Sequence, residues 1–290
     1  MESSERVTNI TKDGYRLFRK RVGAWYWVFT GIALAINALV LILATYALYT
    51  SQFNEDLFGG LVMVFIFPWF VYGVFHAVMR RNLRTDFWKH FATDKGWEYN
   101  KGESLNKERG LMFGVNRFPL ARNVITGEFA GLPLRFFEYF FNVEQGRTSK
   151  SYFYTVFEFR FPGSFPHLYL NYKQDSYNIK PGKELPLPGE LGKKFHLYAP
   201  EQYEIEALQV FSPDVLALIE DLDWKCDIEL VDQELIVYHS GYVNSRGQLE
   251  MEFGKATALV SRLRPTLDRM SFAKIGTNEP YLRGSSNRSN

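Results

Sequence analysis

The chain carries two long apolar stretches near its N-terminus, VGAWYWVFTGIALAINALVLILATYALY at residues 22–49 and LFGGLVMVFIFPWFVYGVFHAVM at residues 57–79. The first contains no Asp, Glu, Lys, Arg or His, and the second contains only His76. A helix that crosses a bilayer needs about 20 predominantly apolar residues. A core helix of a soluble protein carries a polar face, and the apolar core of a signal peptide is only about 7–15 residues long. We therefore predict a transmembrane helical hairpin over residues 22–79.

Basic residues flank the hairpin on both sides, whereas the connection at residues 50–56 has no Lys or Arg. The flanking residues are Arg16, Arg19, Lys20, Arg21, Arg80, Arg81 and Arg84. Because Lys and Arg gather in cytoplasmic flanks, we predict a multi-pass protein of the plasma or inner membrane with both termini in the cytoplasm. Near anionic lipid headgroups each such residue contributes about 1 kcal/mol. We therefore interpret these seven residues as a basic collar at the membrane surface.

The hairpin itself has the composition of an anchor. Ionisable groups inside a membrane mark solute pathways, and His76 lies close to the basic end of its stretch. Asn37 and the small residues Gly31 and Ala35 are predicted to pack the two helices together, with a homo-oligomer as the alternative. Pro68 predicts a kink. A pore or carrier is therefore not expected.

The remainder of the chain is divided by composition and periodicity. Residues 1–21 form a basic cytoplasmic lead, and residues 80–95 continue the helical spacing as a stalk that ends at Gly96. Residues 96–272 are predicted to form a cytoplasmic α+β domain, a mostly antiparallel sheet with packing helices. Residues 273–290 are rich in Gly, Ser, Asn and Arg and are predicted to be disordered.

The sheet is predicted mainly from two aromatic strands, Leu134–Val143 and Tyr152–Phe161. In the second strand Phe157 points to one face and Glu158 and Arg160 to the other, which is typical of a half-buried antiparallel pair. Further strands are predicted at Ile125–Phe129, His167–Tyr172, Phe195–Ala199, Asp227–Val231 and Glu234–His239. Helices are predicted at Glu201–Val210, from Pro213 to Leu222, and at Leu249–Leu263.

Glycine and proline signals set the predicted limits of these elements. Pro162-Gly163 and Asp232-Gln233 are read as turns, and Pro265 as an interruption of the last helix. Residues 173–194 are read as a long surface loop.

No motif in the sequence specifies a chemistry. The net charge is +2, which does not indicate nucleic-acid binding, and Cys226 is the only cysteine, which suits a cytoplasmic domain without disulfides. Phosphate-binding glycine loops, zinc-binding His–Glu motifs and serine-nucleophile motifs are absent. Four histidines are scattered and are predicted to be structural or exposed: His90, His167, His196 and His239. We expect no cofactor and no metal, and we expect Cys226 to be a buried apolar residue.

Several short runs between residues 117 and 267 resemble a known group of proteins. They include ARNVITGEF at 121–129, GLPL at 131–134, FSPD at 211–214 and LIVY at 235–238. With these runs the chain resembles a widespread set of uncharacterised bacterial membrane-associated proteins, which have N-terminal spans and a cytoplasmic α+β domain of unknown function. The resemblance implies a shared fold and no catalytic residues.

Three functions remain open at this point. The leading hypothesis is a non-catalytic membrane-anchored binding or scaffold protein with a protein or lipid partner. The alternatives are a membrane-bound enzyme whose site is formed from dispersed residues and an accessory subunit of a transport or envelope-assembly complex. A deep polar pocket with convergent ionisable groups would favour the enzyme, and a flat domain with an exposed apolar groove would favour the binding protein.

Overall fold

A computed structural model describes residue 10 and residues 23–50, 55–106, 108–145, 148–174, 177 and 179–270. The predicted lead and tail therefore lie almost wholly outside the described residues. The chain divides into two compact units, Met1–Phe87 and Trp88–Asn290, which we call the helical unit and the sheet unit.

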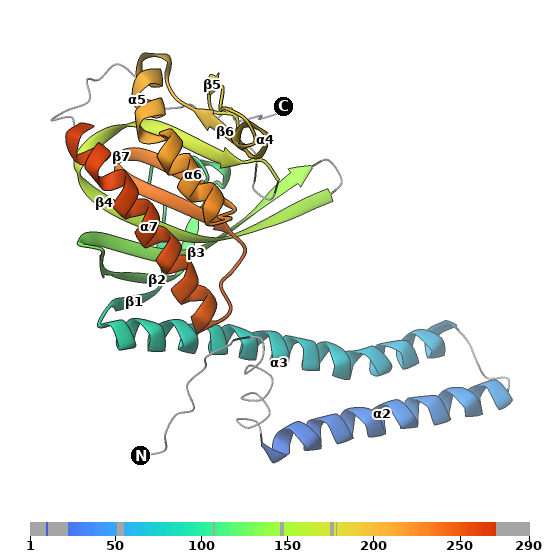
Figure 1. Ribbon diagram of the computed structural model, residues 1–290. Helices are drawn as coiled ribbons and strands as arrows, with labels where there is room; N and C mark the ends of the chain where they lie inside the picture. The colour runs from blue at the N-terminus through green and yellow to red at the C-terminus, as the bar shows by residue number, and fades with distance from the viewer. Residues whose placement is uncertain are drawn as a thin grey trace. The chain divides into compact units, whose positions relative to one another are not determined.

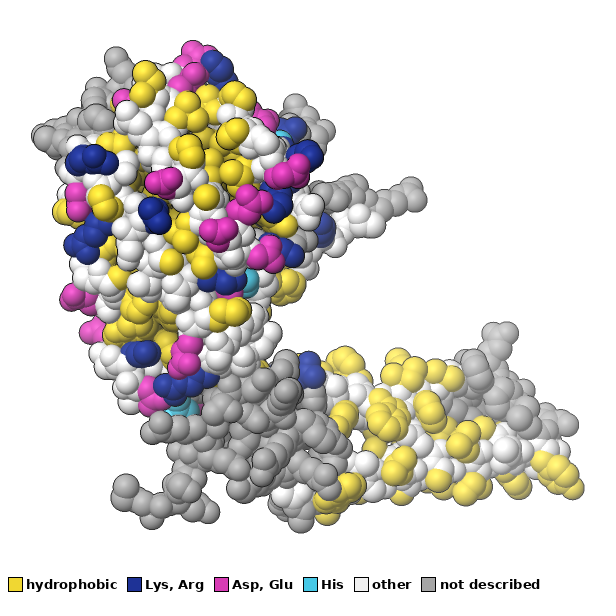
Figure 2. All heavy atoms as spheres, viewed as in Figure 1, with side chains coloured by type: hydrophobic (Ala, Val, Ile, Leu, Met, Phe, Trp, Pro, Cys, Tyr) yellow, Lys and Arg dark blue, Asp and Glu magenta, His cyan; other side chains and the backbone are white. Residues whose placement is uncertain are grey.

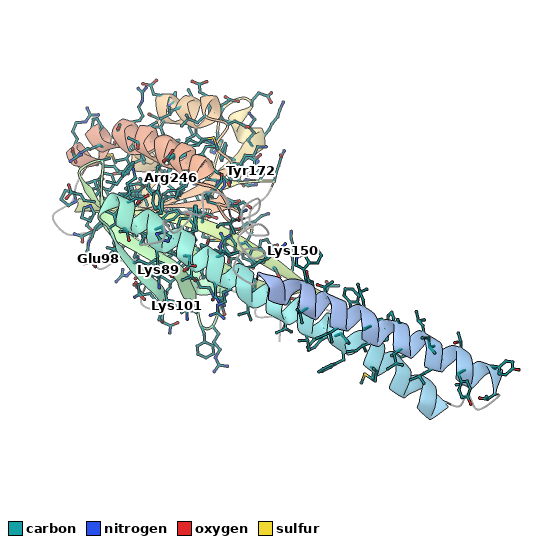
Figure 3. The ribbon with its side chains drawn as sticks, turned by 90° about the horizontal axis from the view of Figure 1, so that it is seen from below. Lys89, Glu98, Lys101, Lys150, Tyr172 and Arg246 are labelled. Carbon is teal, nitrogen blue, oxygen red and sulfur yellow. The ribbon has the colours of Figure 1, made fainter. Side chains whose placement is uncertain are left out.

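In the helical unit, α2 (Ala24–Tyr49) and the first part of α3 (Glu55–Lys95) lie side by side and antiparallel (Figures 1 and 3). The buried residues of α2 are Asn37, Val40 and Ala47. Gly31 and Ala35 are exposed, so this small pair does not pack the two helices together as predicted. Asn37, in contrast, lies on the packed face.

One described segment, Thr30–Ala47, is long and apolar enough to cross a membrane, with a mean hydropathy of 2.0. In α3 the described apolar stretch is shorter, Val62–Val74, so a second full span at residues 57–79 is not confirmed. Apolar side chains on both helices face outward (Figure 2): Ile42 is 63% exposed and Phe67 is 65% exposed.

The described part of the sheet unit contains seven strands, and every pairing between them is antiparallel. The strands are β1 (Glu98–Ser104), β2 (Leu120–Phe129), β3 (Leu132–Gln145), β4 (Thr148–Tyr172), β5 (Glu184–Leu185), β6 (Phe195–Tyr198) and β7 (Cys226–Ser240). Their order is β1-β2-β3-β4-β6-β5, and β7 also pairs with β4. The predicted α+β class with a mostly antiparallel sheet is confirmed.

Helices cover one face of this sheet (Figure 1). They are α5 (Glu204–Val210), α6 (Pro213–Asp221) and α7 (Arg246–Met270). The short helix α4 (Leu191–Lys194) adjoins β6, and short 3-10 turns lie at Phe113–Val115 and Glu201–Tyr203. The last turns of α3 belong to the same layer. Trp88 is fully buried and its ring lies 5.0 Å from that of Phe136, while Phe91 stacks on Phe253 at 5.8 Å. From Trp88 onward, the predicted stalk is therefore part of the core.

The opposite face is covered by a segment between β1 and β2, which we call the cover segment (residues 105–106 and 108–115). Its Phe113 ring lies 5.3 Å from Tyr139 and 5.7 Å from Tyr238. Residues Thr155–Phe159 are consequently all buried. The predicted half-buried pair is wrong for this reason: both faces of the sheet are covered, and Glu158 does not reach solvent.

Two predicted turns are bends within continuous strands. β4 runs through Pro162-Gly163 and β7 runs through Asp232-Gln233. The register between β4 and β7 shifts twice, from Arg160 to Phe165 and from Phe165 to Leu168, where β4 has the extra residues. Such bulges bend a strand without ending it.

The predicted interruption at Pro265 and the predicted loop at 173–194 both differ from the structure. Pro265 lies inside α7, which continues to Met270. Proline removes one helical hydrogen bond, and the buried Leu267 beyond it contributes packing that offsets this loss. The predicted loop at 173–194 contains β5 and α4.

Candidate functional site

The double bulge between β4 and β7 opens a polar cleft of about 340 Å³. Bulged strands re-aim their side chains, and here both strands turn polar groups into one space. The lining residues are Glu108, Arg109, Arg160, Ser164, Asp232, Gln233 and Glu234. Glu108 and Arg109 come from the cover segment, so the cleft lies between that segment and the bent part of the sheet.

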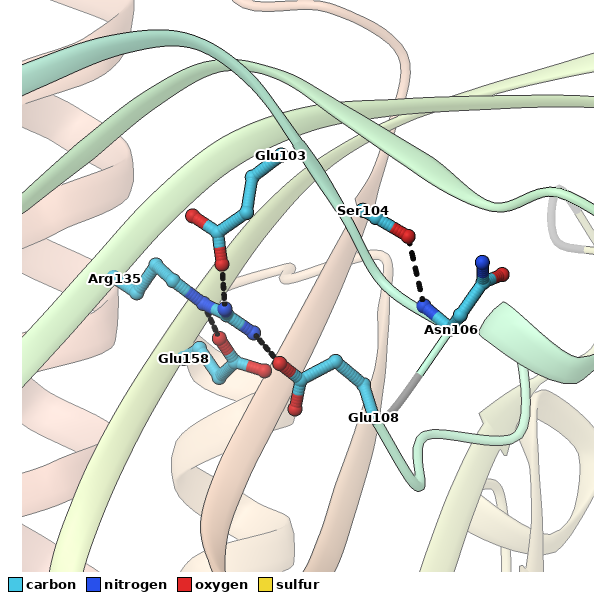
Figure 4. A network of polar contacts seen from close by, with 6 residues as sticks. All are labelled: Glu103, Ser104, Asn106, Glu108, Arg135 and Glu158. Carbon is cyan, nitrogen blue, oxygen red and sulfur yellow. Dashed lines mark hydrogen bonds and ion pairs between the residues drawn. The ribbon is translucent and has the colours of Figure 1, made fainter.

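A single guanidinium holds three carboxylates beside the cleft (Figure 4). Arg135 on β3 contacts Glu103 at 2.7 Å, Glu108 at 2.9 Å and Glu158 through its Nε. Arg135 and Glu158 are direct cross-strand partners. Arg135 is 19% exposed and Glu158 is 4% exposed, so this ion pair is largely removed from water.

Three carboxylates converge at this place: Glu108, Glu158 and Glu234. One oxygen of each lies within 4.8 Å of the others. Oε2 of Glu158 accepts from Arg135, whereas its Oε1 is buried and has no hydrogen-bond partner among the described residues. Burial raises the pKa of Glu158 to about 7, although Arg135 opposes this shift. Burial and then the charge of Glu108 also raise the pKa of Glu234.

The raised pKa of Glu158 predicts a stability that falls as pH rises. A carboxyl whose pKa is near 4.5 unfolded and about 7 folded is held neutral by folding between these values. Its contribution is present below about pH 4.5 and is lost through pH 7, by at most ~3 kcal/mol. In the wild type the melting temperature should fall between pH 5 and pH 8, and we expect Glu158→Gln to reduce this dependence on pH. The melting temperatures are measured with EDTA present. Glu190→Gln removes an exposed carboxyl and should leave the dependence of the melting temperature on pH as it is in the wild type. If Glu158→Gln also left this dependence unchanged, the prediction would be wrong.

The rim of the cleft carries its own charge pairs. Arg109 lies 3.2 Å from Asp232, and Arg160 donates to Gln233 at 2.9 Å. Among the described residues, the groups in and beside the cleft comprise five carboxylates and three guanidinium groups, a formal net charge of −2. The carboxylates are Glu103, Glu108, Glu158, Asp232 and Glu234.

A fully buried carboxylate fixes the cover segment on the sheet. Glu229 accepts from the backbone N–H of Leu111 at 2.9 Å and from the hydroxyl of Tyr238 at 2.7 Å. His167 Nε2 lies 2.5 Å from its Oε1. Since Leu111 lies three residues after Glu108, these bonds also place Glu108 beside the cleft.

The other singled-out residues have separate surroundings. His167 is buried, His196 contacts Glu184 and His90 is exposed. Burial lowers the pKa of His239, which lies 3.4 Å from Glu252. Cys226 is a free, buried cysteine, and burial raises the pKa of its thiol.

Of the predicted basic collar, the structure describes only the members on α3. Arg80 and Arg81 are exposed and Arg84 is partly exposed. Arg16, Arg19, Lys20 and Arg21 lie outside the described residues, so the collar as a whole stays a prediction.

The acidic cleft could not be predicted from the sequence. The alternation of the strand places Glu158 on a solvent face, and Glu108 lies in a segment without periodicity. The available signal was a pair of charged residues inside a strand that is otherwise aromatic and apolar. Such a pair in a buried strand needs partners, but the sequence does not say which.

No family model matches the chain, and no curated protein matches it. A solved structure to which it is similar is the crystal structure of the mycobacterial trehalose monomycolate transport factor A, TtfA. The identity is 17% over 61% of this chain and 93% of that chain, and the TM-score is 0.41. A likeness at this level says nothing about function.

Proposed function

We propose that this protein is a membrane-anchored binding or scaffold protein, held in the plasma or inner membrane by a helical hairpin. The observation that carries this is the outward exposure of apolar side chains on both α2 and α3. Only 17% of the Thr30–Ala47 segment is buried, whereas a core helix of a soluble protein is mostly buried. Large exposed apolar surfaces mark contact with a membrane or a partner. Lipid is the partner that suits a continuous apolar helix surface of this length.

The charge around the hairpin supports a cytoplasmic position for both termini. Arg80, Arg81 and Arg84 follow the apolar stretch of α3, and the loop at residues 50–56 has no basic residue. In this arrangement the collar contacts anionic headgroups at the inner face. The sheet unit is then also cytoplasmic, and its single buried cysteine suits a reducing compartment.

The acidic cleft is the proposed binding site of the sheet unit. The described groups in and beside it have a formal net charge of −2, which suits a cationic group better than an anionic lipid headgroup. A protein partner that presents basic side chains fits this charge. The lipid contact of the protein is therefore assigned to the hairpin and collar, and the protein contact to the cleft.

A second function, a membrane-bound enzyme, is favoured by one specific observation. The cleft brings ionisable groups together, and the pKa of Glu158 at about 7 suits a general acid or base. We rank this second because Glu158 is 4% exposed and paired with Arg135, which leaves little room beside the carboxyl for an organic substrate.

The binding function is tested by photo-crosslinking of the full-length protein in cells. A photoreactive phenylalanine replaces Gln233 at the cleft, and a matched one replaces the exposed Glu190. We expect a discrete light-dependent protein adduct from position 233 and none from position 190. Recovery of the protein alone from both positions would count against a scaffold and for the enzyme. An adduct with a membrane transport or envelope-assembly protein would assign it to such a complex.

A further inference from the structure

We infer that the acidic cleft binds one divalent cation through Glu108, Glu158 and Glu234, of the hard class that includes Ca²⁺, Mg²⁺ and Mn²⁺. The inference rests on the proposed function in one respect only, that the cleft is a binding site. It does not depend on the membrane anchor or on a protein partner.

The positions of the three carboxylates suit a single ion. Their converging oxygens lie within 4.8 Å of one another. Calcium binds oxygen at about 2.3–2.6 Å, so two of its ligand atoms can be up to roughly 5 Å apart. One ion can therefore touch all three side chains after small movements. The set contains only oxygen, which favours hard cations over zinc or copper.

The buried oxygen of Glu158 independently points to a ligand. Its Oε1 is buried and has no hydrogen-bond partner among the described residues, and Figure 4 shows this side of the carboxylate turned toward Glu108. A buried polar atom without a partner is costly. A cation between Glu158 and Glu108 would satisfy this oxygen, which Arg135 does not reach.

Charge also favours a divalent ion. The described groups in and beside the cleft have a formal net charge of −2, which one divalent cation would neutralise. Arg135 binds one oxygen of Glu158 and one oxygen of Glu108. The second oxygen of each carboxylate does not bind Arg135 and can contact the ion. The positive charge of Arg135 repels the cation and weakens its binding. We therefore expect a dissociation constant of about 10–100 µM rather than the nanomolar values of calcium-buffering proteins.

The test is calorimetric titration of the full-length, detergent-solubilised protein with CaCl₂, MgCl₂ and MnCl₂ after EDTA treatment, at pH 7.5. We expect saturable binding of one ion of this class. Glu234→Gln and Glu158→Gln should each weaken it by at least about tenfold. Glu190→Gln removes an exposed carboxylate elsewhere and should leave it unchanged. Glu234 is partly exposed, so its variant folds even if Glu158→Gln does not.

Two results would overturn the inference: no saturable binding of any of the three ions up to about 1 mM, or equal affinities in Glu234→Gln and Glu190→Gln. If cation binding fails but the adduct at position 233 persists, the cleft remains a protein-binding site and only the cation inference is lost.

Discussion

Replacing Arg135 with methionine lowers the free energy of unfolding by about 3–5 kcal/mol at pH 8, because it leaves a buried carboxylate without its counter-charge. Glu158 is 4% exposed and faces Arg135 directly across the β3–β4 pair. Glu103 and Glu108 lose the same partner. The methionine keeps most of the apolar stem, so the loss reports the guanidinium, whose carbon also lies 5.4 Å from the centre of the Phe137 ring.

The destabilisation by Arg135→Met depends on pH in a defined direction. Below about pH 6 most of the Glu158 carboxyl is neutral, since its pKa is already about 7 with Arg135 present, so the loss should be smaller there. The double variant Arg135→Met, Glu158→Gln should recover part of the stability at pH 8, because the two residues interact directly.

Denaturant unfolding of the full-length protein in detergent, followed by tryptophan fluorescence, measures these effects. Arg160→Met is the matched control. Arg160 lies on β4, two residues after Glu158, but it is exposed and bonds only to Gln233 among the contacts described, so its loss should cost less than about 1 kcal/mol. If the free energy of unfolding of Arg135→Met lies within about 1 kcal/mol of the wild-type value at pH 8, Arg135 is not the residue that stabilises the buried carboxylates of this cluster.

Replacing Glu229 with alanine is expected to cost about 3–5 kcal/mol as well, for a different reason. The carboxylate is fully buried and is the common acceptor for the Leu111 N–H, the Tyr238 hydroxyl and His167. Each buried donor that loses its acceptor costs about 1–3 kcal/mol, and the removed atoms leave a cavity. Glu229→Gln keeps one acceptor oxygen and should cost roughly half as much.

Glu229→Ala should also weaken ligand binding in the cleft. The bond from the Leu111 N–H to Glu229 fixes the cover segment, which carries Glu108. We therefore expect lower cation affinity and faster amide hydrogen exchange at residues 108–115, with β3 less affected. Glu250→Ala, which removes an exposed carboxylate from α7, provides the matched control. Unchanged exchange at residues 108–115 in Glu229→Ala would show that other contacts hold the cover segment.

Local periodicity was sufficient to predict α5, α6 and α7 but not the short α4, which lies in the predicted loop. In α7, Phe253, Leu259, Val260 and Leu263 form a buried face. In α6, Val215, Leu216 and Ile219 are buried, and Leu222, where the predicted helix ends, is half-buried. Apolar residues recur about every 3.6 residues along the side of each helix that faces the core. The whole pattern is therefore contained in one continuous stretch of sequence.

The bends in the sheet could not be predicted in the same way. Pro162-Gly163 and Asp232-Gln233 have turn-forming composition, yet both lie within continuous strands. Proline and glycine indicate that regular pairing is lost at a point. Whether the chain then reverses or bends depends on the register with a strand some 70 residues away, which local composition does not contain.

The candidate site depends even more on distant contacts. The alternation in Tyr152–Phe161 correctly separates Glu158 from Phe157, but a solvent face was inferred because nothing in that strand reveals the cover segment. Glu108 reaches the site from a segment without helical or strand periodicity. The cleft therefore emerges only when three separate parts of the chain, the cover segment, β4 and β7, are placed together.

The central claim, a sheet unit held at the cytoplasmic face by a helical hairpin, is tested most directly by cysteine labelling in spheroplasts. The native Cys226 is buried and should give little background. Ser51→Cys places a thiol in the connection between the two apolar stretches, and Glu190→Cys places one at a position where the native side chain is 67% exposed on the sheet unit. A membrane-impermeant maleimide should label position 51 in intact spheroplasts and position 190 only after permeabilisation. Labelling of position 190 in intact spheroplasts, or protection of position 51 until permeabilisation, would contradict the proposed anchor and orientation.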